Sequence, residues 1–98
     1  MNIVLIGYRG TGKSVVGQIL ARDLDMGLEG MDANIVKRAG MSIPEIVEKY
    51  GWDRFREIET EEAFDLAGKD NLVIDTGGGV IERPENIEAL SRNGTVFW

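Results

Sequence analysis

Near its start the chain reads Ile3-Val4-Leu5-Ile6-Gly7-Tyr8-Arg9-Gly10-Thr11-Gly12-Lys13-Ser14. The apolar run at residues 3–6 is typical of a strand buried on both faces of a parallel sheet. The loop that follows fits the pattern G-x-x-x-x-G-K-[ST] at every defined position. Apolar residues then recur at helical spacing from Val15 to Leu24. A strand, this loop and a helix in that order predict a phosphate-binding loop.

The residue types of this loop suit phosphate chemistry. Glycines let several backbone N–H groups point at one phosphate, which a helix N-terminus also favours. Lys13 can reach the outer phosphates, and the Ser14 hydroxyl can ligate Mg²⁺. The alternative is a ligand-free glycine-rich turn, which the Lys-Ser pair and the two correct flanking elements disfavour. The predicted nucleotide-binding residues are Gly7, Gly10, Thr11, Gly12, Lys13, Ser14 and Val15.

Composition excludes several other classes of protein. The 98 residues contain no cysteine and no histidine, so a disulfide framework, thiolate catalysis and a Ser-His triad are excluded. Eleven Lys and Arg against 17 Asp and Glu give a net charge of −6, which argues against nucleic-acid binding. No apolar run approaches the roughly 20 residues of a membrane span. We therefore expect a cytoplasmic protein with a single domain over residues 1–98. We also expect a monomer, although composition does not determine the oligomeric state.

Further elements alternate along the chain. We predict a weak second strand within 26–31, a helix capped by Asp32 and ended by Gly40, a helix opened by the capping box of Ser42 and Glu45, a helix over 52–67, a strand at 72–74 that runs into Asp75, a helix from Pro84 through Leu90, and a strand at 95–98. This alternation predicts an α/β fold with a parallel sheet. Because the chain stops inside an apolar strand, we expect it to be truncated, with an exposed edge strand as the alternative.

Three features follow where an acceptor substrate would bind. Asp32 comes after the second strand, at the edge where open α/β sheets bind ligands, and its carboxylate could orient a hydroxyl and accept its proton. Arg56 could hold a carboxylate through two parallel hydrogen bonds. The triplet Gly77-Gly78-Gly79 would let a small ligand approach the backbone closely. The alternatives are that Asp32 is only a helix cap, Arg56 only a charge on a helix surface, and the glycine triplet only a turn.

These motifs together resemble shikimate kinase. The resemblance is carried by the phosphate loop, the run from Asp32 to Ile43, the segment Phe55-Arg56-x-x-Glu59 and the turn Thr76-Gly77-Gly78-Gly79. It implies a three-layer α/β/α fold of the P-loop kinase type, with a parallel sheet of order 2-3-1-4 and an acceptor-binding helical segment at about 32–67. It also implies transfer of the γ-phosphoryl group of ATP to the 3-hydroxyl of shikimate, with Mg²⁺, in the synthesis of aromatic amino acids.

The resemblance also implies roles for individual residues. Lys13 and Asp32 would be catalytic, with Asp32 as the candidate base, and Arg56 would bind the shikimate carboxylate. Gly77, Gly78 and Gly79 would line the shikimate pocket. Glu59 would support Arg56, because residues three apart share a helix face. The family continues into a lid and an adenine pocket, so we expect this chain alone to have little activity. The alternatives are a kinase for another polyol acid, such as gluconate, and a non-catalytic nucleotide-binding remnant.

The sequence departs from the family at the metal site. The family has Asp-x-Asp after the second strand, and Gly30 occupies the first of these positions, whose acid is associated with Mg²⁺. Asp75 ends an apolar strand, as the acid that holds Mg²⁺ does in many P-loop proteins. We predict that Asp75 and Ser14 hold the metal, with Asp75 acting through a water. The alternative is that Asp75 only accepts hydrogen bonds from the Gly77–Gly79 turn.

Overall fold

The computed structural model describes residues 1–6, 13–76 and 84–97, without the side chains of Lys13 and Ser14. Nine elements form in these ranges, in agreement with the predicted order. The strands are β1 (Asn2–Leu5), β2 (Gly27–Gly30), β3 (Leu72–Asp75) and β4 (Gly94–Phe97). The helices are α1 (Lys13–Asp23), α2 (Met31–Ala39), α3 (Ile43–Tyr50), α4 (Trp52–Ala67) and α5 (Pro84–Arg92). The predicted elements therefore form, with small differences at their ends.

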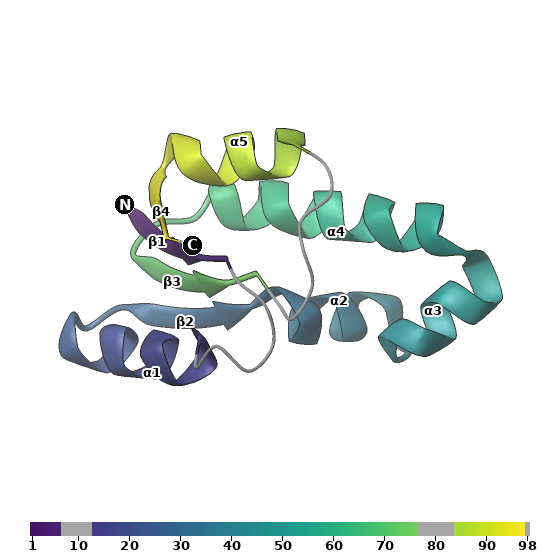
Figure 1. Cartoon of the computed structure of the whole chain (residues 1–98), viewed down its shortest axis with the longest axis horizontal. Coiled ribbons are helices and arrows are strands. Elements are labelled where there is room, and N and C mark those ends of the chain that lie inside the picture. Colours follow the sequence, from purple (N-terminus) through teal and green to yellow (C-terminus); the bar gives the residue numbers. More distant parts are fainter. Residues whose placement is uncertain (7–12, 77–83, 98) are drawn as a thin grey trace.

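The four strands make one parallel sheet of order β2-β3-β1-β4, which confirms the predicted topology. Ile3 pairs with Val73 on one side and with Thr95 on the other. Helix α1 lies on one face of the sheet, and α4 and α5 lie on the opposite face (Figure 1). The fold is thus the expected three-layer α/β/α arrangement, in which all strands end at one edge, here called the carboxyl edge.

The main core lies between the sheet and the α4–α5 layer. Its fully buried members come from five elements: Val4, Met31, Ala63, Leu66, Ile74 and Leu90. On the opposite face, Gly17 of α1 lies over the side chains of Leu5, Leu28 and Val73. Helix α1 covers β2 and β3, whereas Phe97 on β4 is 52% exposed. Burial is therefore deeper on the α4–α5 side.

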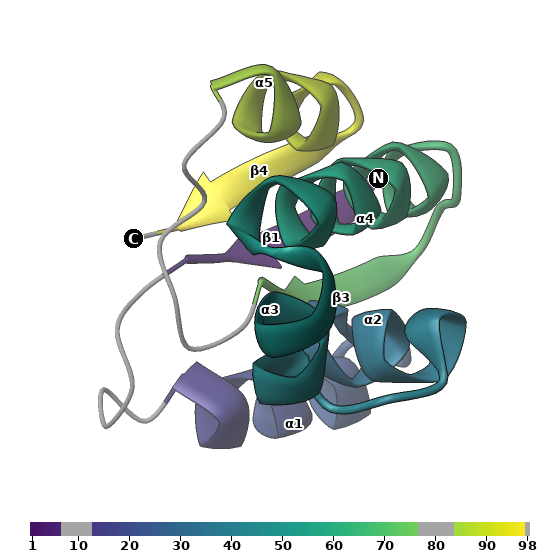
Figure 2. The ribbon, with the colours of Figure 1, turned by 90° about the vertical axis from the view of Figure 1, so that its right-hand side faces the viewer.

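A second, smaller core holds together α2, α3 and the first half of α4. Ile35, Ile46 and Ile58 are buried against one another, one from each helix. These helices extend beyond the carboxyl edge, and α3 lies across the end of the molecule that faces the viewer in Figure 2. The extended shape, 40 × 26 × 22 Å, follows from this projecting part. We call α2, α3 and the first half of α4 the acceptor arm.

Local signals set the helix ends of the acceptor arm. The capping box forms as predicted, with Ser42 and Glu45 each satisfying the other's backbone N–H. Gly40 ends α2 with a positive φ of 73°, a left-handed conformation that glycine adopts readily. The prediction that Asp32 caps α2 is wrong. Gly30 holds that position because α2 begins directly after β2, which places Asp32 inside the first turn.

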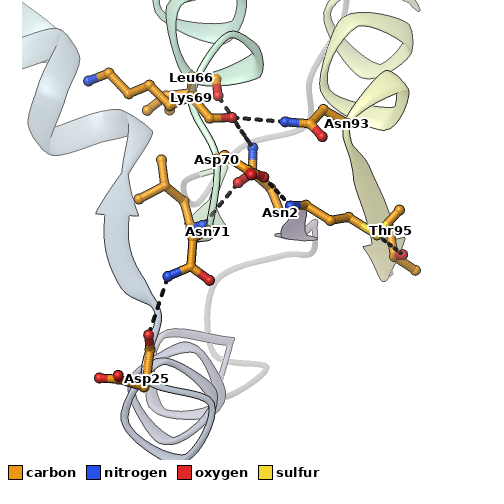
Figure 3. A network of polar contacts seen from close by, with 10 residues as sticks. Asn2, Asp25, Leu66, Lys69, Asp70, Asn71, Asn93 and Thr95 are labelled. Atoms are coloured by element: carbon orange, nitrogen blue, oxygen red, sulfur yellow. Dashed lines mark hydrogen bonds and ion pairs between the residues drawn. The ribbon is translucent and has the colours of Figure 1, made fainter.

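Asn2 organises the opposite edge of the sheet, where the strands begin (Figure 3). Its side chain is buried and donates hydrogen bonds to the carbonyls of Leu66 and Lys69, at 3.4 and 3.1 Å. It also accepts a 2.9 Å hydrogen bond from the backbone N–H of Leu72. Asn93 donates to the same Lys69 carbonyl at 2.9 Å. One amide group thus ties β1 to the end of α4 and to β3.

Within residues 1–6, 13–76 and 84–97, no helix combines the length and apolar character that a membrane crossing needs.

Candidate active site

The ends of β1 and β3, the strands that precede the two glycine-rich segments in the sequence, are joined by hydrogen bonds. Thr76 donates two hydrogen bonds to the Leu5 carbonyl, from its backbone N–H at 3.2 Å and from its hydroxyl at 2.9 Å. Thr76 is 3% exposed, so this junction is part of the buried structure. Residues 7–12 and 77–83 follow these two strands and lie outside the described residues. The roles predicted for Gly7, Gly10, Thr11, Gly12 and the glycine triplet therefore stay predictions. The strand ends that precede these two segments are adjacent.

Helix α1 is the third element near this edge of the sheet, after the ends of β1 and β3. It begins at Lys13, directly after residues 7–12, and packs on β2 and β3. The N-terminus of a helix carries partial positive charge and unpaired backbone N–H groups, which favour a phosphate. The side chains of Lys13 and Ser14 lie outside the described part. Val15, a predicted nucleotide-binding residue, is 59% exposed.

Asp32 lies at the same edge, one strand further along the sheet. Gly30 ends β2 opposite Asp75 of β3, and α2 starts at the next residue. Asp32 is half-buried in the first turn of α2 and takes part in an interaction within the chain. The carboxyl-edge position expected from the sequence is therefore confirmed, although its expected role as a helix cap is not. A carboxylate in this first turn also complements the helix dipole.

Arg56 and Glu59 lie on the buried face of α4. Ala63 and Leu66 of the same face pack in the main core, and Glu59, one turn earlier, is only 8% exposed. Arg56 continues this face by one more turn and is half-buried. Both residues take part in interactions within the chain. The three-residue spacing thus places Arg56 and Glu59 on one face of α4, whereas Arg54 is exposed and pairs with Glu57.

A polar network between α2 and α4 was not predicted. Glu62, 4% exposed, accepts hydrogen bonds from Asn34 at 2.8 Å and from two nitrogens of Arg38 at 2.9 and 3.3 Å. Asn34 also donates to Glu29 at 2.9 Å. Hydrogen bonds to Asp65 and Glu62 raise the pKa of the Arg38 guanidinium. A buried glutamate needs hydrogen-bond partners. The position of Glu62 on the apolar face of the predicted helix over 52–67 is therefore the feature of the sequence that could have indicated this network.

This network borders an open hollow of about 470 Å³. Its lining residues are Glu29, Asn34, Lys37, Arg38, Glu62, Asp65 and Lys69. Three acidic and three basic side chains balance one another there, so the hollow favours neither an anion nor a cation. None of the predicted site residues that the structure describes lines it. We therefore assign the network a structural role, in which it fixes α2 against α4.

The donors at the carboxyl edge fit Mg²⁺ bound together with a nucleotide. Among the described residues, no three His, Cys, Asp or Glu side chains gather into a metal site. Mg²⁺ commonly takes one or two protein carboxylates and completes its shell with phosphate oxygens and water. Asp75 is half-buried at this edge, and a Cβ added at the neighbouring Gly30 would meet no atom of the described residues within 4 Å. One carboxylate at this edge is compatible with a metal that is shared with phosphates.

Comparison with protein families gives one clear match. The model of the shikimate kinase family matches residues 9–98. Shikimate kinase from Geobacter sulfurreducens is 50% identical over 95 residues, which are 97% of this chain and 52% of that protein. Shikimate kinase from Caldicellulosiruptor bescii is 41% identical over 97 residues, 99% of this chain and 56% of that protein.

Solved structures agree with this match. Shikimate kinase from Aquifex aeolicus aligns with a TM-score of 0.89 at 43% identity, over 98% of this chain and 57% of that one. Shikimate kinase from Acinetobacter baumannii, solved in complex with shikimate, aligns with a TM-score of 0.90 at 40% identity, over 97% of this chain and 53% of that one. The chain thus spans about half the length of the relatives it matches.

Proposed function

Because the chain belongs to the shikimate kinase family, we propose that it takes part in the ATP-dependent phosphorylation of the 3-hydroxyl of shikimate. The relatives that carry this name, and the related structure that holds shikimate, support the proposal. They do not favour a gluconate-type kinase. The monomeric state and the cytoplasmic location expected from the sequence stay predictions.

One structural observation carries the proposal. The parallel register places the end of β1, the end of β3 and the start of α2 at one edge of the sheet. The phosphate loop therefore departs from the sheet beside the strand that leads to the glycine triplet, and Asp32 follows the next strand. Arg56 belongs to the buried face of the helix that packs behind this edge. A donor phosphate and a small acidic acceptor would each have suitable groups there.

The residues suggest a division of roles in the reaction. Lys13 would neutralise the outer phosphates of ATP, and Arg56 would hold the shikimate carboxylate through a two-bond fork, supported by Glu59. Asp32 would orient the 3-hydroxyl and accept its proton as the oxygen attacks the γ-phosphorus. The bond from that phosphorus to the bridging oxygen would break, leaving ADP. Backbone N–H groups of Gly77, Gly78 and Gly79 would border the acceptor.

Mg²⁺ would supply charge neutralisation of the phosphates and a fixed geometry for the transfer. Within this chain the Ser14 hydroxyl and the Asp75 carboxylate are the groups that we propose to hold it, by analogy with other P-loop proteins. Most of the rate enhancement would come from positioning and charge neutralisation, since phosphoryl transfer needs little covalent chemistry from the protein.

Nucleotide binding is tested by titration calorimetry with ADP. Lys13→Ala should weaken the affinity at least tenfold, which corresponds to about 1.4 kcal/mol, because a charge-assisted contact with the phosphates is lost. Lys49→Ala is the matched control, since this lysine is exposed on α3, far along the sequence from the loop. Equal affinities for the wild type and Lys13→Ala would contradict the assigned role of the phosphate loop.

Acceptor binding is tested by titration with shikimate, using gluconate as the competing ligand. Arg56→Lys should weaken shikimate binding although the charge is kept, because lysine cannot form the planar fork. Arg54→Lys is the control, since Arg54 is exposed on the same helix and pairs with Glu57. Tighter binding of gluconate than of shikimate, or no loss in both Arg56→Lys and Asp32→Ala, would contradict the substrate assignment.

A further inference from the structure

One residue, Asn93, separates helix α5 from strand β4, which begins at Gly94. Asn93 is half-buried, and its side-chain amide donates a 2.9 Å hydrogen bond to the Lys69 carbonyl (Figure 3). Its own backbone carbonyl accepts a 2.7 Å hydrogen bond from the N–H of Asn2. Asn93 therefore connects the start of β4 to β1 and to the segment that follows α4.

Gly94 is required by its surroundings. A Cβ added at this position would lie 2.9 Å from the carbonyl oxygen of Leu90 and 3.1 Å from that of Asn2. Both atoms belong to the backbone, so neither can move aside without displacing β4 from α5 or from β1. The fold thus needs glycine at position 94 and uses the side-chain amide at position 93, and these two demands together produce an Asn–Gly pair.

An Asn–Gly pair is chemically reactive. The backbone nitrogen that follows an asparagine can attack the carbonyl carbon of its side chain. A new C–N bond forms, the bond to the side-chain nitrogen breaks, and ammonia leaves with the proton of the attacking nitrogen. Water then opens the cyclic imide at one of its two carbonyls, which gives aspartate or isoaspartate. Glycine favours this attack because it has no side chain to obstruct it and has the greatest backbone freedom.

The sheet leaves the attacking nitrogen unpaired in the ladder. Because the Asn93 carbonyl bonds to Asn2, and Asn2 is the register partner of Gly94, the Gly94 N–H points away from β1, toward the side of β4 where no described strand lies. The other asparagines of the chain are followed by isoleucine or leucine: Asn2, Asn34, Asn71 and Asn86. We propose that Asn93 is a site of spontaneous deamidation, at which the hydrogen bond to the Lys69 carbonyl limits the rate in the folded chain.

Deamidation removes the contacts that Asn93 makes in the fold. An ionised carboxylate has no N–H, so it cannot donate to the Lys69 carbonyl, and its charge would face that oxygen. The Asp70 carboxyl is also close, since its pKa is lowered chiefly by the N-terminal ammonium and in part by a hydrogen bond from the Asn93 side chain. Isoaspartate would in addition lengthen the backbone by one carbon next to the bond with Asn2. The modified chain is therefore less stable at the edge where the strands begin.

The site is tested by incubating the chain in warm, mildly alkaline buffer, with and without guanidinium chloride, and mapping its peptides by mass spectrometry. Cleavage after glutamate gives a peptide of residues 89–98, which contains Asn93 and no other asparagine. We expect this peptide to gain one mass unit and to separate into aspartate and isoaspartate forms, while the four other asparagines serve as unchanged internal controls. The reaction should be roughly tenfold slower in the folded chain, because the bond to Lys69 must open first.

The consequence for stability is tested by urea unfolding of Asn93→Asp, which supplies one product directly, beside the wild type and Asn93→Ala. We expect Asn93→Asp to lower the midpoint more than Asn93→Ala, because it adds charge repulsion to the lost hydrogen bonds. Deamidation of Asn93 no faster than that of the other asparagines overturns the site, and equal rates with and without guanidinium chloride overturn the role of the Lys69 bond. A midpoint of Asn93→Asp equal to that of the wild type overturns the structural consequence.

Discussion

Removal of the Glu62 carboxylate tests whether the polar network between α2 and α4 fixes the acceptor arm. Glu62 is 4% exposed and receives hydrogen bonds from Asn34 and Arg38. The substitution Glu62→Ala leaves these donors without their shared acceptor. Helix α2 carries Asp32 in its first turn, so a shift of α2 against α4 would move Asp32 relative to Arg56.

The magnitude follows from the geometry of the network. Breaking a fully buried ion pair costs about 3–5 kcal/mol, and each hydrogen bond to a charged group contributes about 1.5–3 kcal/mol. Here the Arg38 side chain is 37% exposed and keeps Asp65, and Asn34 keeps Glu29. Partial compensation by water and by these partners lowers the cost. We therefore expect Glu62→Ala to reduce the free energy of unfolding by about 2–3 kcal/mol.

Urea unfolding followed by circular dichroism measures this cost, with an unchanged slope as the sign that only stability has altered. Glu61→Ala is the matched control, because Glu61 is 54% exposed and lies 4.0 Å from the same guanidinium. We expect the control to lose less than about 0.5 kcal/mol. Shikimate affinity should fall in Glu62→Ala, with ADP affinity unchanged. A loss of stability no greater than that of Glu61→Ala would refute the reasoning.

Three further predictions concern single features of the fold. Ile46→Ala should cost about 2–5 kcal/mol in urea unfolding, since Ile46 is fully buried in the small core of the acceptor arm; a loss below 1 kcal/mol would show that this core is not formed. Ser42→Ala should cost about 1 kcal/mol in the same assay, because the capping box is lost, whereas Ser91→Ala, whose serine lies in the last turn of α5, should be close to neutral. The N-terminal ammonium donates a hydrogen bond to Asp70 and lowers the pKa of that carboxyl below its ordinary value of 3.8. The stability that this pairing contributes is present above pH 3.8 and is lost as the pH falls through the lowered pKa, so Asp70→Asn should make the stability less dependent on pH in this acid range. An unchanged acid dependence in Asp70→Asn would contradict the pairing.

Much of the fold was predictable because its signals are local. The capping box of Ser42 and Glu45, and the glycines at positions 40, 51 and 68, set helix ends within a few residues of the chain. The order of the strands had a different source, the resemblance to a family, since local patterns do not determine which parallel strands are neighbours. The cap assigned to Asp32 failed because β2 passes into α2 without a loop, which places the N-cap two residues earlier, at Gly30.

The site was predictable where residues share one element and less so where they come from several. The inner position of Arg56 and Glu59 follows from helical spacing alone. The Glu62 network joins residues 24 and 28 positions apart, so it depends on how α2 packs against α4. The pairing of Gly30 with Asp75 depends on sheet register, which the two strand sequences do not specify by themselves.

The Asn2 network also bears on the order in which the chain can fold. Leu72 donates its backbone N–H to Asn2 across a separation of 70 residues, and β1 pairs with strands that come late in the chain. Contacts so distant in sequence require closure of long loops, which slows folding. During synthesis on a ribosome, the first strand made must therefore wait, unpaired, until β3 has emerged. The helices of the acceptor arm, whose small core comes from residues 35–58, can assemble earlier.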